Sequence, residues 1–174
     1  MSNERRPPPP LNAASLDALA LRYVERFATT RGKLATYLAR KVRERGWDGP
    51  AVDPQAIAER MAGFGYIDDR AYAEAKARAL ARRGYGTRRV SQALHAAHVA
   101  PDDAVVALEA SDEQAFNSAI AFARRRRFGP FAVTAPDDRL RERQLAAMLR
   151  AGHPFSLARR IISAPLREVP EEDM

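Results

Sequence analysis

The sequence predicts an all-α protein made of three tandem three-helix repeats, and three observations lead to this prediction. Of the 174 residues, 46% are hydrophobic, with alanine prominent among them, and 29% are charged; alanine, leucine, arginine and glutamate enter helices at little cost. Apolar residues recur at helical spacing in nine segments. Proline opens every third segment, at Pro54, Pro101 and Pro154, and a period of roughly 50 residues is typical of helical repeat arrays.

The three triplets share a second landmark, an arginine one or two residues before a glycine, between two helices. It occurs at Arg31-Gly32, at Arg83-Gly84 and at residues 127–129 (Arg-Phe-Gly). The alternative is an irregular all-helical domain in which the prolines coincide by chance. Because the landmarks recur together, the repeat interpretation is favoured.

The first repeat is expected over residues 14–64, after a disordered, proline-rich arm at residues 1–13. Its first helix follows Ser15, a plausible N-cap. Its second helix ends at Gly46, and Trp47 is placed to fold back over the helix end. Its third helix has Asp53 as the cap and proline at the first helical position.

The second repeat is expected over residues 65–111 and has the clearest local signals. Ile67, Asp68 and Tyr72 occupy the positions of a hydrophobic staple at the start of a helix. Gly84 stands where a glycine ends that helix, and Thr87 can cap the next one. These signals predict two helices joined by a glycine turn.

The third repeat is expected over residues 112–163. Its first helix begins near Asp112 and ends in four arginines, and a long internal loop follows at residues 128–136. Asp137 caps the next helix, and Pro154 opens the last one. The acidic tail, residues 164–174, is expected to be loose.

Three Asp-Asp pairs, at residues 68–69, 102–103 and 137–138, raise the question of acid–base catalysis. Adjacent residues on a helix point in different directions, so a shared catalytic pocket is disfavoured. Each pair lies at a predicted helix start, where an aspartate accepts hydrogen bonds from free amides and its charge suits the helix dipole. We therefore interpret the pairs as caps.

Other signs of chemistry are weak. His95 and His98 could share a helix face, but neither they nor His153 have further ligands at suitable spacing, so no metal site is expected. The Gly-Tyr-Gly turn at residues 84–86 lacks the context of a phosphate-binding loop. The chain has no cysteine, and no serine or threonine lies in a nucleophile motif. We expect no enzyme activity, no catalytic residue and no cofactor.

The charge of the chain predicts an anionic partner. The formal net charge is +7 and the isoelectric point is about 10.3, which suits nucleic acid, an anionic membrane surface or an acidic protein face. No apolar run approaches the roughly 20 residues of a membrane span, and the first residues do not form a secretion signal. We therefore expect a cytoplasmic protein that does not enter a membrane.

Basic and aromatic residues gather at two helix ends and are the candidate contacts for a partner or nucleic acid. The candidates are Lys76, Arg82, Arg83, Tyr85, Arg88, Arg89, Arg124, Arg125, Arg126, Arg127 and Phe128. Arginines can hold phosphates or carboxylates bidentately, and aromatic rings can stack on bases or fill a partner's pocket. The alternative is a solvated surface, since at most two of four consecutive arginines share a helix face.

The central part of the chain resembles the RecX family of regulatory proteins. The resemblance is carried by residues 65–69 (Gly-Tyr-Ile-Asp-Asp), by Tyr72-Ala73 and by residues 82–86 (Arg-Arg-Gly-Tyr-Gly), followed by Val90, Leu94 and Val99. Residues 23–47 and 124–130 look like the flanking repeats of that family. The likeness covers about residues 16–162, although the family pattern lacks the proline-rich arm and the loop at 128–136.

This resemblance implies an elongated, curved superhelical array of three-helix repeats. It implies a modulator, usually an inhibitor, of the RecA recombinase, lodged in the groove of the RecA filament on DNA and restraining its ATPase and strand exchange in recombination, DNA repair and the SOS response. Partners would be the RecA filament and, weakly and without sequence preference, single- or double-stranded DNA. We expect a monomer. Arg82, Arg83, Tyr85, Arg88 and Arg89 match the basic hinge of the family.

A second functional hypothesis stays open, a free-standing DNA-binding protein of the helix-turn-helix type. The turn between Arg83 and Arg89 prompts it. It predicts tight binding to naked duplex with a steep dependence on salt, whereas the RecX hypothesis predicts slower ATP hydrolysis by RecA on DNA.

Overall fold

The structure, a computed structural model, describes residues 8–172 and is helical throughout. Within these residues there is no strand beyond an isolated bridge between Leu11 and Trp47, so the predicted all-α class is confirmed. The helices are α1 (Ala13–Arg26), α2 (Arg31–Arg45), α3 (Pro54–Gly63), α4 (Asp69–Arg82), α5 (Thr87–Ala96), α6 (Pro101–Glu113), α7 (Ala115–Arg126), α8 (Asp138–Arg150) and α9 (Phe155–Ser163), with a 3-10 turn, η1 (Gly129–Phe131). In this described part, no helix is both long and apolar enough to cross a bilayer.

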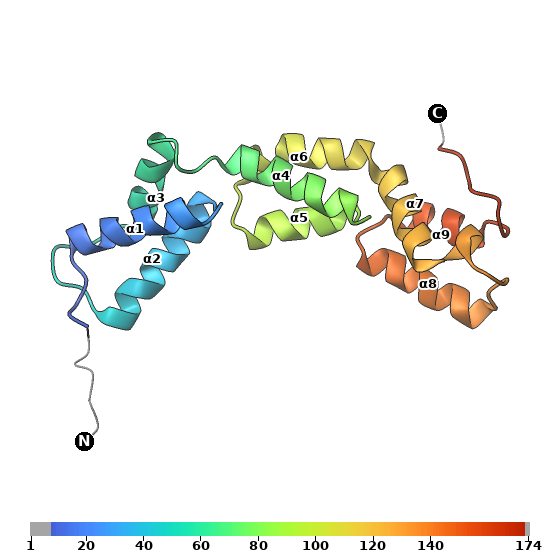
Figure 1. Cartoon of the computed structure of the whole chain (residues 1–174), viewed down its shortest axis with the longest axis horizontal. Helices are drawn as coiled ribbons and strands as arrows, with labels where there is room; N and C mark the ends of the chain where they lie inside the picture. Colours follow the sequence, from blue (N-terminus) through green and yellow to red (C-terminus); the bar gives the residue numbers. More distant parts are fainter. Residues whose placement is uncertain (1–7, 173–174) are drawn as a thin grey trace, which may run out of the picture. The chain divides into compact units, whose positions relative to one another are not determined.

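The described residues form two compact units. Unit 1 extends to Tyr72 and includes residues 97–99, and unit 2 contains residues 73–96 and those from 100 onward. In unit 1, α1, α2 and α3 pack together (Figure 1). Their shared core includes the fully buried Leu16, Leu34 and Leu38, which lie on the apolar stripes that helical spacing predicts.

The packed structure of unit 1 begins earlier than the sequence suggests. Leu11, inside the predicted arm, is fully buried; its N–H donates to Gly46 O (3.0 Å), and its carbonyl accepts from Asp48 N (2.8 Å). The predicted cap of α1 is also wrong, because Asn12 caps the helix and Ser15 is its reciprocal partner three residues later. The first seven residues of the predicted arm lie outside the described residues.

The Arg31-Gly32 pair, which the sequence placed between two helices, lies at the start of α2 in the structure. Thr30 caps α2 and accepts from Lys33 N (3.1 Å), so Gly32 lies within the first turn of α2. The glycine is required there because a Cβ atom would collide with His98. Gly32 is therefore a packing residue rather than a hinge.

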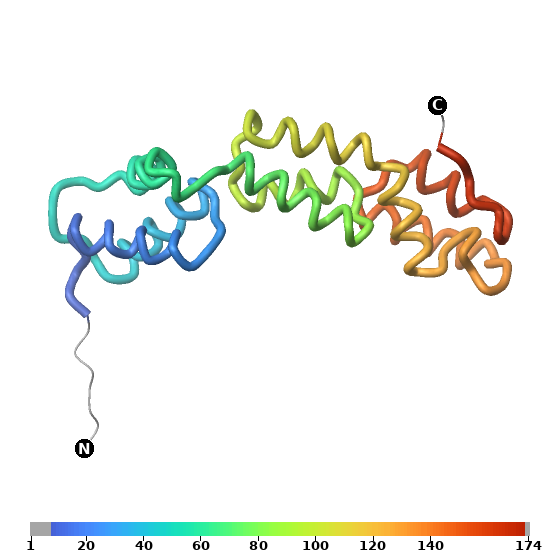
Figure 2. The backbone as a smooth tube through the Cα atoms, turned by 45° about the horizontal axis from the view of Figure 1, so that its top comes forward, coloured from blue at the N-terminus to red at the C-terminus, as the bar shows by residue number. Residues whose placement is uncertain are grey.

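Unit 2 contains most of α4 and the helices from α5 to α9. Figure 2 shows α7, α8 and α9 gathered together toward the red end of the chain. Their core includes Phe122, Met148 and Ile161, each at most 7% exposed. A helix was expected to begin near Asp112, but α6 continues to Glu113 and so runs through the predicted repeat boundary at residues 111–112.

The predicted loop and tail of the third repeat are more ordered than expected. The loop contains η1, where Gly129 N donates to the buried Gln144 side chain (3.1 Å). The beginning of the tail is attached to the same turn, since Arg167 N donates to Pro130 O (2.9 Å). Residues 173–174 lie outside the described part, and the division into three repeats stays a prediction.

Candidate functional site

The turn between α4 and α5, which carries several of the predicted contact residues, is closely packed. Gly84 has a φ of 76°, and a Cβ there would lie 2.8 Å from Phe122 N. Two residues on, Gly86 N donates to Ala151 O (3.0 Å), and a Cβ on Gly86 would collide with Gly152 O. The two glycines thus let the turn contact both α7 and the α8–α9 turn.

His153 joins the same turns from inside. Its side chain is buried, and Nε2 lies 3.0 Å from Gly84 O; since a carbonyl only accepts, Nε2 carries the proton. Burial lowers the pKa of His153 from its ordinary 6.5, against the opposing effect of the hydrogen bond to Gly84. The neutral ring is therefore a structural part of the site, and the sequence had suggested no role for it.

Arg125, one of the predicted contact residues, is used within the protein. Its guanidinium donates to Arg83 O (2.8 Å) and Arg82 O (3.1 Å). These carbonyls belong to the last residue of α4 and the residue after it, at a helix end where carbonyls lack intrahelical partners. The contact therefore joins the ends of α4 and α7.

Aromatic rings hold several of the other predicted arginines. The Tyr85 ring centre lies 5.2 Å from the guanidinium carbon of Arg83 and 6.0 Å from that of Arg89. Arg126 lies 5.7 Å from the Phe122 ring centre. Such cation–π contacts restrict each guanidinium to a limited region, so these arginines are less free than the sequence alone would suggest.

An open pocket of about 370 Å³ brings two of these arginines beside a third that the sequence analysis missed. It is lined by Tyr85, Arg89, Phe122, Arg126, Ala147, Arg150 and Ala151. None of its lining residues is acidic. Arg150 ends α8, and no local pattern distinguishes it from the other arginines of that helix.

The remaining predicted contact residues lie outside this pocket. Lys76, Arg82, Arg88, Arg124 and Arg127 are exposed, and Arg124 lies 5.1 Å from the Phe131 ring centre. The ring of Phe128 is half-buried and packs edge-on to Phe122, with 6.2 Å between centres, so it supports the core of unit 2. The role of all these residues in partner contact stays a prediction.

The aspartate pairs have divided roles. Asp68 caps α4 through Ala71 N (2.9 Å), and Asp137 caps α8 through Leu140 N (2.7 Å), as predicted. The pair at residues 102–103 lies in the first turn of α6, where its charge suits the helix dipole. The N-cap residue itself is Ala100 and proline takes the first helical position, so neither aspartate is the N-cap that the sequence predicted.

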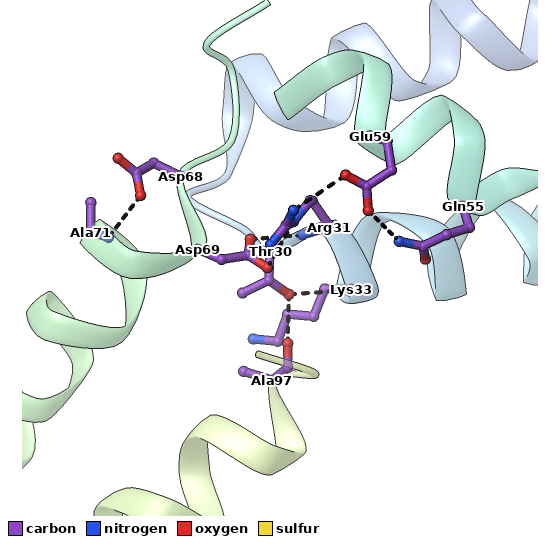
Figure 3. A network of polar contacts seen from close by, with 9 residues as sticks. All are labelled: Thr30, Arg31, Lys33, Gln55, Glu59, Asp68, Asp69, Ala71 and Ala97. Carbon is purple, nitrogen blue, oxygen red and sulfur yellow. Dashed lines mark hydrogen bonds and ion pairs between the residues drawn. The ribbon is translucent and has the colours of Figure 1, made fainter. Parts of the chain in front are cut away.

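Asp69 is buried and belongs to a polar network of unit 1 (Figure 3). It accepts from Arg31 N (3.0 Å) and from Arg31 Nε (3.3 Å). Arg31 also reaches Glu59 (3.2 Å), and the neighbouring Thr30 hydroxyl donates to Ala97 O. This network ties the starts of α2 and α4 to α3 within unit 1, so Asp69 is structural rather than a cap or a catalyst.

Comparison with known proteins identifies the family. Residues 68–108 match the family model for the second three-helix domain of RecX. The regulatory protein RecX of Myxococcus xanthus is 35% identical over 176 residues, covering 92% of each chain. That of Agrobacterium fabrum is 31% identical, covering 87% of this chain and 84% of its own.

Solved structures show the same fold. The crystal structure of RecX from Lactobacillus salivarius superposes with a TM-score of 0.60 over 86% of this chain and 93% of its own, at 18% identity. Another crystal structure of the regulatory protein RecX gives a TM-score of 0.58 at 23% identity. Since curated relatives match along nearly the whole chain, this protein belongs to the RecX family of regulatory proteins.

Proposed function

We propose that the protein binds the RecA filament on DNA and modulates, mostly inhibits, its ATPase and strand exchange in recombination and DNA repair. The observation that carries this proposal is the similarity to the regulatory protein RecX of Myxococcus xanthus over 92% of both chains. The exposed Arg82, Arg88, Arg124 and Arg127 of unit 2 support it, since exposed arginines suit a nucleoprotein of negative charge. The protein acts as a binding regulator rather than an enzyme, as a monomer and in the cytoplasm, where a DNA-bound recombinase works.

The competing hypothesis, a free-standing helix-turn-helix DNA-binding protein, fits the packing of α5 less well. In such proteins the N-terminal residues of the second helix contact base edges in the major groove. Here Gly86 N and Arg88 N, at the start of α5, donate to the α8–α9 turn. The start of α5 is therefore partly covered, and we expect only weak DNA binding without sequence preference.

The direct test is hydrolysis of ATP by RecA on single-stranded DNA, measured while the protein is titrated in. We expect hydrolysis to slow as the filament is occupied. No effect at saturation would reject the proposal. Tight binding to naked duplex in the absence of RecA, with salt dependence near −0.9 per phosphate contacted, would favour the competing hypothesis.

A fourfold variant tests whether the predicted hinge makes the contact. Alanine at Arg82, Arg83, Arg88 and Arg89 should leave helicity unchanged and weaken the inhibition. The matched control places alanine at Arg22, Arg26, Arg40 and Arg43, four exposed arginines of unit 1, and removes the same charge. Equal weakening by both variants would mean that overall charge, not the hinge, holds the filament. Loss of the circular dichroism signal in the hinge variant would show those arginines to be structural.

A further inference from the structure

The pocket beside the α4–α5 turn combines a cationic edge with an apolar wall. Arg89, Arg126 and Arg150 are exposed, whereas Ala151 is 3% exposed. The three arginines come from α5, α7 and α8, respectively. Three guanidinium groups without a lining carboxylate leave a local positive charge that an anion can neutralise.

Two of the three guanidinium groups lie over aromatic rings before a ligand arrives. Arg89 lies on the Tyr85 ring and Arg126 on the Phe122 ring, at 6.0 and 5.7 Å from the ring centres. A planar guanidinium restrained in this way loses less entropy when it makes two parallel hydrogen bonds to a phosphate. The geometry therefore suits phosphate recognition.

The pocket has room and apolar surface for more than a phosphate. Its volume of about 370 Å³ falls in the range of pockets that bind small organic ligands. The wall offers the Tyr85 ring and two alanines, Ala147 and Ala151, which suit a flat apolar group. A glutamate side chain from an acidic protein would satisfy the arginines but leave this wall uncovered.

We propose that this pocket binds one nucleotide of a single-stranded nucleic acid, with its phosphate among the three guanidinium groups and its base against the wall. A base in a duplex is paired and stacked on its neighbours, whereas a base in a single strand can turn outward onto a protein surface. The inference deepens the proposed function and rests on it for the presence of a DNA strand at unit 2. It adds Arg150 to the contact residues.

The phosphate contact is tested with the full chain and a fluorescently labelled oligothymidylate, by anisotropy over a salt series. Arg150→Ala should weaken binding about fivefold or more and make the salt slope shallower by about 0.7, the value for one phosphate of a single strand. The control is Arg141→Ala. Arg141 is exposed on the same helix. It lies nine residues before Arg150, which is about two and a half helical turns, so the two side chains point to opposite faces of α8. Equal effects of the two variants would overturn the proposal.

The base contact is tested with an abasic oligomer of the same length. The protein should bind the oligothymidylate about fivefold more tightly than the abasic strand, as expected for one stacked base. Ala147→Leu places a larger side chain on the wall, where the base is proposed to lie. This variant should lose the preference and leave the salt slope unchanged. Equal binding of both strands by the unmodified chain would overturn the proposal, whether or not the leucine variant folds. Circular dichroism checks that each variant keeps its helices.

Two further ligands separate this site from its alternatives. If Arg150→Ala weakened binding to a duplex as much as to the single strand, the pocket would be a general phosphate contact and the proposal would fail. If a glutamate-rich peptide displaced the strand from the unmodified chain but not from the variant, the pocket would belong to an acidic protein partner. Because these measurements omit RecA, a chain that binds as proposed but leaves RecA hydrolysis unchanged would refute only the proposed function.

Discussion

Replacing Gly84 with alanine should destabilise unit 2 for two separable reasons. The residue has a φ of 76°, and an L side chain in this left-handed region costs about 1–2 kcal/mol. The new Cβ would also lie 2.8 Å from Phe122 N and 3.0 Å from its Cα. These are backbone atoms that no change of rotamer can move away, and overpacking of this kind costs about 1–3 kcal/mol. The expected loss in the free energy of unfolding is therefore about 2–5 kcal/mol.

Gly65→Ala is a matched control for this experiment. Gly65 has a nearly equal φ, 82°, but a Cβ there would meet nothing within 4 Å. Only the backbone cost of about 1–2 kcal/mol applies, so the difference between the two variants measures the contact with Phe122. The loss in the free energy of unfolding of each variant is measured by urea unfolding followed by circular dichroism. Trp47 fluorescence gives a second signal, from unit 1. If Gly84→Ala lost no more than Gly65→Ala, the close approach of the turn to α7 would be refuted.

Two further predictions concern the N-terminal segment and the buried histidine. Leu11→Ala should lower the free energy of unfolding by about 2–5 kcal/mol, as for a buried leucine. Alanine at the exposed Pro8 is the control and should have little effect. If the two variants unfolded at similar urea concentrations, the packing of Leu11 would be contradicted. The pKa of His153 is lowered from 6.5 in the folded state, so the unfolded state takes up the proton first. Stability should fall as the pH drops below 6.5, by at most about 1.4 kcal/mol per pH unit. His153→Gln should reduce this dependence in urea midpoints measured from pH 7.5 to pH 5, and an unchanged dependence would show that another group causes it.

Helix starts were predictable where a short-range bond decides them. Asp53, Asp68 and Asp137 each accept from a backbone N–H two or three residues ahead, so a few adjacent residues contain all the information needed. Asn12 was missed because the box is reciprocal: Ser15, taken as the cap, lies three residues further on and its side chain bonds back to the Asn12 backbone. The all-helical class was predictable for a similar reason, since the apolar stripes and helix-favouring composition act within a few turns.

Burial across long sequence distances was not predictable in this way. Leu11 reads as part of a proline-rich arm, yet backbone hydrogen bonds to residues 46 and 48 hold it in the core. Asp69 looks like its neighbour Asp68, yet it pairs with Arg31, 38 residues earlier. Arg125 looks like a solvated member of an arginine run, yet it caps α4.

The candidate site shows the same division between local and long-range information. Composition and motif spacing identified the arginines and Tyr85 of the α4–α5 turn, together with the resemblance to RecX proteins, because these features lie within one continuous stretch. The pocket depends on residues 85, 126 and 150 meeting at one place, and on glycines that let three chain segments approach closely. Such a meeting is decided by tertiary packing. The free energy that favours it comes from contacts between side chains distant in sequence, and these contacts form only when the helices pack together. For this reason Arg150 and His153 entered the site from the tertiary structure alone.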